Sequence, residues 1–248
     1  MPLDAILLGF LCFFVIAALY STVGHAGASG YLAVMALLSF PSHEIKPVSL
    51  ILNIIVASIA SYRFLKEGYF DKKVFLLFAG FSIPMAFVGG YFKADDHVFK
   101  LLAGIFLLLS ALMVVYRITQ SKAQTYAVKP VKAWKAGLLG SAIGYTSGLM
   151  GVGGGIFLSP ILLLSQWALP KNISGTSALF ILVNSVLGLA GHVSAINSIP
   201  KNTFYWMGAV VLGGLLGSHL GTQKIKTNGI YIVLSVVLFS AGIKMLFF

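Results

Sequence analysis

Long apolar runs separated by short polar stretches extend along the whole chain. Dividing the chain at its polar clusters and its Gly and Pro breaks predicts ten apolar helical segments, at residues 4–20, 31–40, 47–65, 73–92, 98–116, 134–147, 156–169, 174–194, 203–222 and 229–247. The third to fifth and the eighth to tenth have about the 20 residues needed to cross a bilayer, whereas the other four are shorter. The pattern predicts an all-α integral membrane protein with several short, broken helices.

The two sets of five segments repeat each other. Three glycines recur at one constant spacing and four other positions recur at a slightly larger one, the pairs being Gly24/Gly148, Gly27/Gly151, Gly30/Gly154, Asn53/Asn184, Ala86/Gly217, Gly90/Gly221 and Lys93/Lys224. Because each set has an odd number of crossings, the two repeats are predicted to be inverted in the membrane. We expect a first transmembrane repeat over residues 1–119, a cytoplasmic linker over 120–133 and a second transmembrane repeat over 134–248.

The composition excludes an ordinary soluble protein. Of the 248 residues, 58% are apolar and only 9% are charged, and the mean hydropathy is +0.96. The net charge of +11 could indicate nucleic acid binding in a soluble protein, but here the basic residues fall between apolar segments. They therefore indicate topology at an anionic membrane surface, with the lipid bilayer as partner and no nucleic acid.

The distribution of Lys and Arg predicts the orientation. Loops after odd-numbered segments hold Arg63, Lys66, Lys72, Lys73, Arg117, Lys122, Lys129, Lys132, Lys135, Lys171, Lys224 and Lys226. The opposite loops and the C-terminal end hold Lys46, Lys93, Lys100, Lys201 and Lys244. We expect a multi-pass protein of the cell inner membrane, with the linker in the cytoplasm and both termini outside. For Lys46 and Lys171 a second interpretation stays open, in which they line a cavity.

Two glycine-rich stretches, residues 21–30 and 147–155, lie between the short segments of each set. Glycine is unfavourable inside helices, so each stretch is predicted to break a helix near mid-membrane, where broken backbone is tolerated only inside protein or beside a polar cavity. A short helix that begins after such a break directs free N–H groups and its positive dipole end toward an anion. The alternative is that these glycines only allow close helix packing, which is the better interpretation for Ala86/Gly90 and Gly217/Gly221.

The acidic residues also favour an anionic substrate. All six lie outside the apolar segments, at Asp4, Glu44, Glu67, Asp71, Asp95 and Asp96. A cation transporter would normally bury at least one acid in the membrane. Together with two predicted positive helix ends, this distribution indicates a small anion.

The candidate substrate-binding residues are the polar and glycine positions in or beside the breaks: His25, Gly27, Ser29, Gly30, Ser49, Asn53, Gly153, Gly154, Gly155, Thr176, Ser177 and Asn184. Amide and hydroxyl groups can donate to anion oxygens, and His25 or His192 could carry a proton. Alternative roles are interhelical hydrogen bonding for the asparagines and structural roles for the histidines. Residues 174–177 could cap the start of the eighth segment, bind an oxyanion, or do both.

No enzyme pattern is found. The chain has no H-E-x-x-H, G-x-S-x-G or Walker motif, and no strand or ribose acid accompanies the glycines of residues 151–155. Its single cysteine, Cys12, allows neither an intrachain disulfide nor a cysteine metal cluster. We expect neither a catalytic site nor a metal or other cofactor.

The order of these motifs resembles the TauE/SafE sulfite exporter family. The resemblance rests on residues 148–160, 174–177 and 191–192, with a degenerate first copy in residues 24–30, Pro47 and Ser49, and it covers essentially the whole chain. It implies secondary transport of sulfite, organosulfonates or related sulfur-containing anions, usually as export, with the site between two inverted halves. His25 and Ser29 stand among the first glycines as a departure from the family pattern.

Two other functions stay open at this point. The same motifs would suit a small-anion channel, and a non-transporting membrane scaffold subunit would use the glycines for packing alone. Small-residue faces such as Ala86/Gly90 could form a homodimer interface or could pack within one chain.

Overall fold

The computed structural model describes residues 3–92, 95–119, 128–192, 199–200, 202–222 and 228–247, and these residues form helices and no strand. The helices are α1 (Leu3–Ser21), α2 (Ala28–Leu37), α3 (Ser42–Lys66), α4 (Lys72–Tyr91), α5 (Asp96–Thr119), α6 (Ala133–Met150), α7 (Gly155–Leu164), α8 (Pro170–Gly191), α9 (Thr203–Thr222) and α10 (Asn228–Phe247). Each predicted segment corresponds to one helix, so the all-α membrane class is confirmed.

Four helices of the described chain are long and apolar enough to cross a membrane, over His43–Lys66, Lys72–Tyr91, Lys171–Gly191 and Thr203–Thr222. Shorter apolar stretches include α2 and α7, each of ten residues. Most of the predicted linker (residues 120–127) lies outside the described residues, as do Lys93, Lys122, Lys201, Lys224 and Lys226 of the topology argument.

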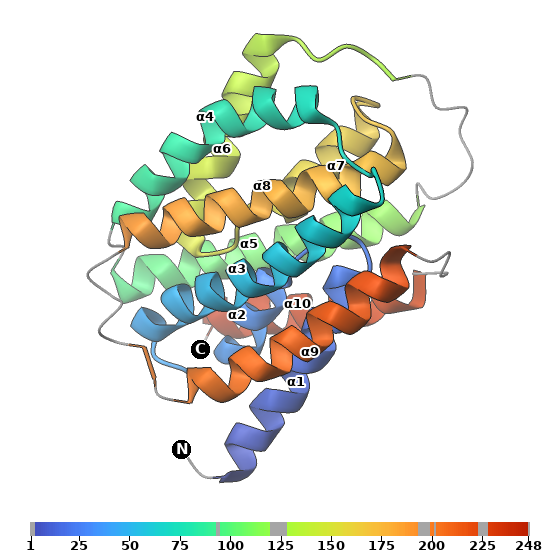
Figure 1. Ribbon diagram of the computed structural model, residues 1–248. Coiled ribbons are helices and arrows are strands. Elements are labelled where there is room, and N and C mark those ends of the chain that lie inside the picture. The colour runs from blue at the N-terminus through green and yellow to red at the C-terminus, as the bar shows by residue number, and fades with distance from the viewer. Residues whose placement is uncertain are drawn as a thin grey trace.

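The two sets of helices interlock instead of forming separate halves. Figure 1 shows α4 and α6 at one end of the molecule, α1 and α9 at the other, and α3 and α8 between them. Helix α4 of the first set packs against α6 and α8 of the second, and α9 of the second set packs against α1 and α3 of the first. Exchanging each helix for its counterpart in the other set (α1 for α6, α2 for α7, α3 for α8, α4 for α9 and α5 for α10) therefore leaves this packing pattern unchanged.

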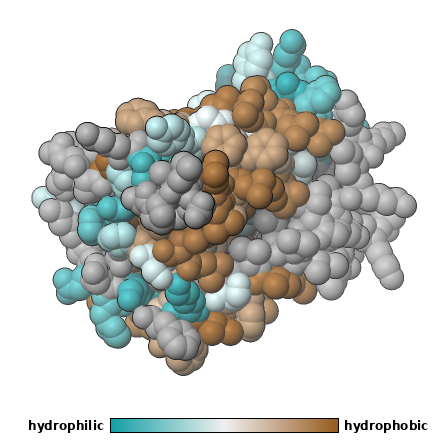
Figure 2. Space-filling model, turned by 90° about the horizontal axis from the view of Figure 1, so that it is seen from below, coloured by the Kyte–Doolittle hydropathy of each residue, from teal (hydrophilic) through white to brown (hydrophobic). Residues whose placement is uncertain are grey.

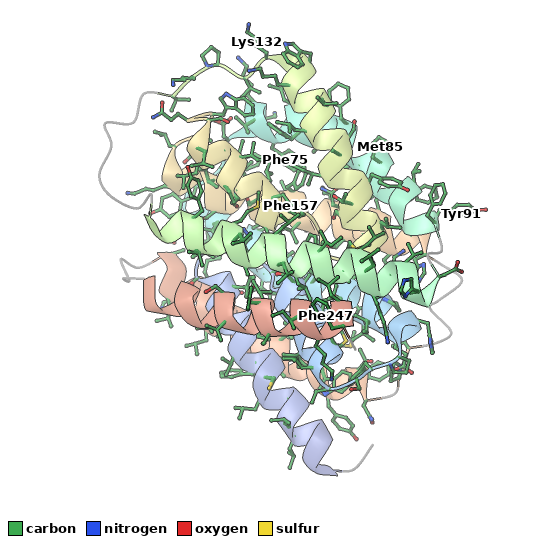
Figure 3. The ribbon with its side chains drawn as sticks, turned by 180° about the vertical axis from the view of Figure 1, so that it is seen from behind. Phe75, Met85, Tyr91, Lys132, Phe157 and Phe247 are labelled. Atoms are coloured by element: carbon green, nitrogen blue, oxygen red, sulfur yellow. The ribbon has the colours of Figure 1, made fainter. Side chains whose placement is uncertain are left out.

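Corresponding helices cross in opposite directions. Asn53 of α3 meets Ser185 of α8, while a residue earlier on α3, Leu50, lies against one later on α8, Gly188. Helices α5 and α10 also run side by side across the face in Figure 3, where Gly104 and Leu108 contact the last turns of α10. Antiparallel counterparts are the arrangement that inverted repeats require.

Rows of small residues hold the parallel pairs α4/α6 and α1/α9 together. On α6, Gly140, Gly144 and Gly148 lie four residues apart, and an added Cβ would meet the carbonyl oxygens of the facing α4 turns. On α9, Gly213, Gly217 and Gly221 meet the carbonyl oxygens of Phe14 and Ala18 of α1 and of Thr22, just after α1, in the same way. The packing interpretation of Gly217/Gly221 is thus confirmed within one chain, because only glycine allows backbones to approach this closely.

The outer surface suits lipid. Large apolar side chains such as Leu11, Leu112 and Leu138 are more than half exposed. Figure 2 shows apolar side chains spread across the middle of the face seen from below, with hydrophilic side chains toward its edges. Exposed apolar surface of this extent is expected where the surrounding solvent is hydrocarbon.

Candidate functional site

The two helix breaks share one backbone design. In the first, α1 ends at Ser21 and α2 begins after Gly27, the N-cap, which has φ 98°. In the second, α6 ends at Met150 and α7 begins after Gly154, also an N-cap, with φ 76°. Both glycines adopt the left-handed conformation, which residues with a Cβ rarely enter. Each break thus turns the chain sharply into a ten-residue helix.

The structure corrects the predicted register between the repeats. Gly24 (φ 75°) and Gly27 take the places of Gly151 (φ 76°) and Gly154, so the glycine pairing is shifted by three residues from the predicted one. Both runs repeat glycine every three residues, so the sequence matches equally well in the wrong register. Gly30 lies inside α2, where it packs against Ile16 and Tyr20, instead of in the break.

Asn53 of α3 connects the first break to the second repeat. Its Oδ1 accepts a hydrogen bond from Ala28 N–H (3.1 Å), the first N–H of α2, and its Nδ2 donates to Ser185 Oγ of α8 (2.8 Å). A Cβ on Gly153 would lie 2.5 Å from Asn53 Nδ2. One turn earlier on α3, Ser49 Oγ donates to Ala28 O (3.2 Å). Asn53 therefore stands where the two breaks meet.

His25 reaches from the first break into the second. Its Nε2 lies 3.0 Å from Gly155 O and 3.0 Å from Ser159 Oγ, both in α7. Because a carbonyl oxygen only accepts, the Nε2–H donates toward it. Ser159 Oγ lies 2.7 Å from Ser177 Oγ of α8, so a buried polar chain runs from His25 through α7 to α8.

The N-terminus of α7 differs from that of α2 in what surrounds it. Its N-cap, Gly154, has no side chain, and among the described residues no side chain accepts from Gly155 N–H or Ile156 N–H. Close to it, Ser147 is fully buried and its Oγ has no hydrogen-bond partner; a Cβ on Gly154 would lie 3.4 Å from Ser147 Cβ. The helix end thus combines free donors with a buried hydroxyl.

Several predicted site residues lie elsewhere. Thr176 Oγ1 accepts from Asp71 N–H (3.0 Å) at the start of α4. Asn184 accepts from Ser82 Oγ of α4 (2.6 Å) and donates to Phe180 O of its own helix (2.8 Å). His192 is the C-cap of α8, and Ser29 Oγ lies 3.0 Å from Tyr20 OH.

Helix α8 also begins earlier than predicted, at Pro170, which places residues 174–177 inside the helix and not at its cap. The predicted capping role of these residues is therefore wrong. Proline at the first helical position is favourable because its missing N–H would have had no helical partner.

Three serines at the breaks are absent from the sequence-based site: Ser147, Ser159 and Ser185. A usable signal existed for one of them, because Ser177, Ile181 and Ser185 are spaced four residues apart and share one face of α8. Asn184 lies about 100° around the helix from Ser185 and so faces α4. Ser147 stands at the start of the second glycine-rich stretch and Ser159 in the apolar segment after it, and neither has a spacing of its own that indicates a site.

Broken helices that meet at a buried polar cluster are typical of membrane transporters. Residues 9–245 match the family model described as "Sulfite exporter TauE/SafE". The chain belongs to the TauE/SafE sulfite exporter family, and the resemblance seen in its motifs is confirmed.

Named relatives agree with this class. The chain is similar to the "Probable membrane transporter protein y4hK" of Sinorhizobium fredii, with 34% identity over 95% of this chain and 96% of that one. It is also similar to the "Probable membrane transporter protein YdhB" of Bacillus subtilis, with 26% identity over 86% and 87% of the two chains. No solved structure matches the chain.

Proposed function

We propose that the protein is a secondary transporter that exports sulfur-containing anions, such as sulfite or an organosulfonate, from the cytoplasm. The observation that carries this proposal is the N-terminus of α7, which has two backbone N–H groups without a side-chain acceptor beside the buried, unpartnered hydroxyl of Ser147. An oxyanion would satisfy all three donors. A helix N-terminus favours such an ion through both its N–H groups and its dipole.

The charge distribution supports an anion over a cation. In the part of the chain that the structure describes, the acidic side chains of Glu44, Glu67, Asp71 and Asp95 are not buried. The groups gathered at the breaks are hydroxyls, an amide and an imidazole, which can all donate hydrogen bonds. A site without carboxylates repels no anion and offers a metal cation no ionised ligand.

His25 is the residue that we propose couples the anion to protons. It belongs to the first break but contacts Gly155 and Ser159 of the second. Protonation would add positive charge next to the α7 N-terminus, and imidazole titrates in the physiological pH range. An anion and a proton would then be bound and released together.

The interlocked packing suggests which parts would move. In one group, α1 contacts α2, α3 and α9, and α3 contacts α2 and α9; in the other, α8 contacts α4, α6 and α7, and α4 contacts α6. We propose that these two groups rock against each other about the α3/α8 contact, where Asn53 meets Ser185. Such movement would expose the breaks to one side of the membrane and then to the other.

The first experiment is thermal unfolding of the purified protein in detergent against a panel of sulfite, sulfate, thiosulfate, sulfoacetate and small carboxylates, at constant ionic strength. An anion at 100 times its Kd stabilises the folded state by about 2.7 kcal/mol. Selective stabilisation by a sulfur oxyanion or sulfonate supports the proposal.

Flux in proteoliposomes then separates the alternatives. A transporter gives saturable uptake of labelled sulfite and counterflow against an unlabelled load. Flux that never saturates indicates a channel. Absence of both stabilisation and flux with every anion of the panel would contradict the proposal and favour a scaffold subunit.

A further inference from the structure

Lys46 is a charged side chain buried in the membrane part of the protein. It lies in the second turn of α3 and is only 5% exposed. Its Nζ donates to Gly90 O (3.1 Å) and Phe92 O (3.5 Å) at the end of α4. Among the described side chains, the one contact of a basic group with a carboxylate within 4.0 Å is His43–Glu44, so no described carboxylate lies that close to this ammonium group.

Two neutral carbonyls do not balance this charge. The C-terminal end of a helix carries only about half a negative charge, and an ammonium group has three N–H donors. A buried cation without a carboxylate is expensive to keep, and ionisable residues inside membranes mark substrate paths. The sign of the charge indicates that such a path carries anions.

Lys46 shares one face of α3 with the site. Ser49 and Asn53 follow it at intervals of three and seven residues, and all three are buried. Seven residues correspond to about 10 Å along a helix. Lys46 therefore lies about two turns from Asn53, on the side of the molecule where α4 ends.

The second glycine run extends along this same face. A Cβ on Gly151 would lie 3.0 Å from Lys46 Cγ, and a Cβ on Gly153 would lie 2.5 Å from Asn53 Nδ2. The backbone of residues 151–153 thus connects the surroundings of Lys46 to the N-terminus of α7. These contacts are independent of the charge argument and indicate the same route.

We propose that Lys46 is an anion-binding residue of the transport path, which holds the substrate anion between the end of α4 and the α7 N-terminus. The anion takes up N–H donors that Lys46 otherwise directs at Gly90 and Phe92. This inference rests on the proposed function, since it assigns a further contact for the same anion. It makes Lys46 the side chain that selects anions by charge.

The test compares neutral and charged replacements of Lys46 with a matched lysine. Lys244 also caps a helix end, because its Nζ donates to Leu37 O (2.6 Å) and Ser39 Oγ (2.9 Å). Apparent Kd for sulfite is measured by thermal unfolding of the full-length protein at constant ionic strength. Lys46→Gln keeps a donor for Gly90 O, and Lys46→Met keeps the volume of the lysine side chain without its charge. Both should weaken sulfite binding about tenfold or more.

Lys46→Arg keeps the positive charge and should bind sulfite more tightly than either neutral variant. Lys244→Gln should bind sulfite within about twofold of the wild type. A folded neutral variant with wild-type affinity would overturn the role of Lys46 and leave the transporter proposal intact. If both neutral variants fail to fold while Lys46→Arg folds, the charge serves the fold, and the proposal is also wrong. If the wild type itself neither binds nor transports any anion, the proposed function fails first.

Discussion

The two helix breaks have almost the same backbone and different surroundings. Each has two left-handed glycines three residues apart before a ten-residue helix, and the second break adds a third, Gly153 (φ 70°). At α2, however, the first N–H already donates to Asn53 Oδ1. At α7 no described side chain accepts from Gly155 N–H, and Ser147 Oγ nearby has no partner.

A repeated motif need not have a repeated role. In the first break, the donor that would hold an anion is used to attach α2 to α3, and Asn53 continues the contact to α8. In the second, the donors remain available. We therefore infer that the first break is mainly a structural joint and that the second is the principal anion contact.

The largest expected effect follows from adding one methyl group to each N-cap. Gly154→Ala and Gly27→Ala both place a Cβ at positive φ, which costs about 1–2 kcal/mol, and both crowd side chains, at 2.7 Å from Ile143 Cγ2 and 2.9 Å from Tyr31 Cζ. We expect Gly154→Ala to reduce sulfite flux about 100-fold, because two donors to a charged ligand are displaced.

Gly27→Ala should lower the unfolding temperature to a similar extent but leave sulfite affinity within about threefold of the wild type, since its helix end is already satisfied by Asn53. Flux in proteoliposomes and thermal unfolding measure the two effects separately. Equal losses of affinity in both variants would mean that the breaks are functionally equivalent.

The two asparagines give a second, smaller contrast. Asn53→Ala leaves Ala28 N–H and Ser185 Oγ without their partner, and Asn184→Ala does the same to Ser82 Oγ. Each should lower the free energy of unfolding by about 1–3 kcal/mol. Only Asn53→Ala should also weaken sulfite binding, because only Asn53 lies beside Gly153.

Isothermal titration of the folded variants with sulfite measures the difference in affinity. Weakened binding in both variants would restore the symmetric site that the matching positions of Asn53 and Asn184 suggested. Unchanged binding in both would reduce Asn53 to an interhelical contact.

Much of the fold follows from local pattern. Apolar runs bounded by polar clusters locate ten helices because a membrane span must be both long and apolar. The break glycines, such as Gly27 and Gly154, are predictable because their residue type restricts the backbone. Helix ends were less predictable: α2 begins three residues before its predicted segment because nothing in Ala28–Gly30 prevents a helix once Gly27 has turned the chain.

The side-chain composition of the site was less predictable. Whether Asn184 or Ser185 faces the breaks depends on the rotation of α8, which packing against α3 and α4 decides. The pairing of the glycine runs was ambiguous because a three-residue period hides a three-residue shift. Contacts between segments far apart in sequence, such as His25 with Ser159, have no local signature.

The smallest expected effect separates stability from binding at Ser147. A fully buried hydroxyl without a partner destabilises the folded protein, so Ser147→Ala should unfold at the same temperature as the wild type or slightly higher. If its hydroxyl donates to the anion at α7, the same change should weaken sulfite binding about tenfold.

Ser110 of α5 is the matched control, since its Oγ is likewise buried and unpartnered. Ser110→Ala should behave like Ser147→Ala in thermal unfolding without anion and like the wild type in sulfite titration. Identical titrations for both variants would show that the Ser147 hydroxyl does not bind the anion and is only a packing defect. The second break would then have no hydroxyl donor that distinguishes it from the first.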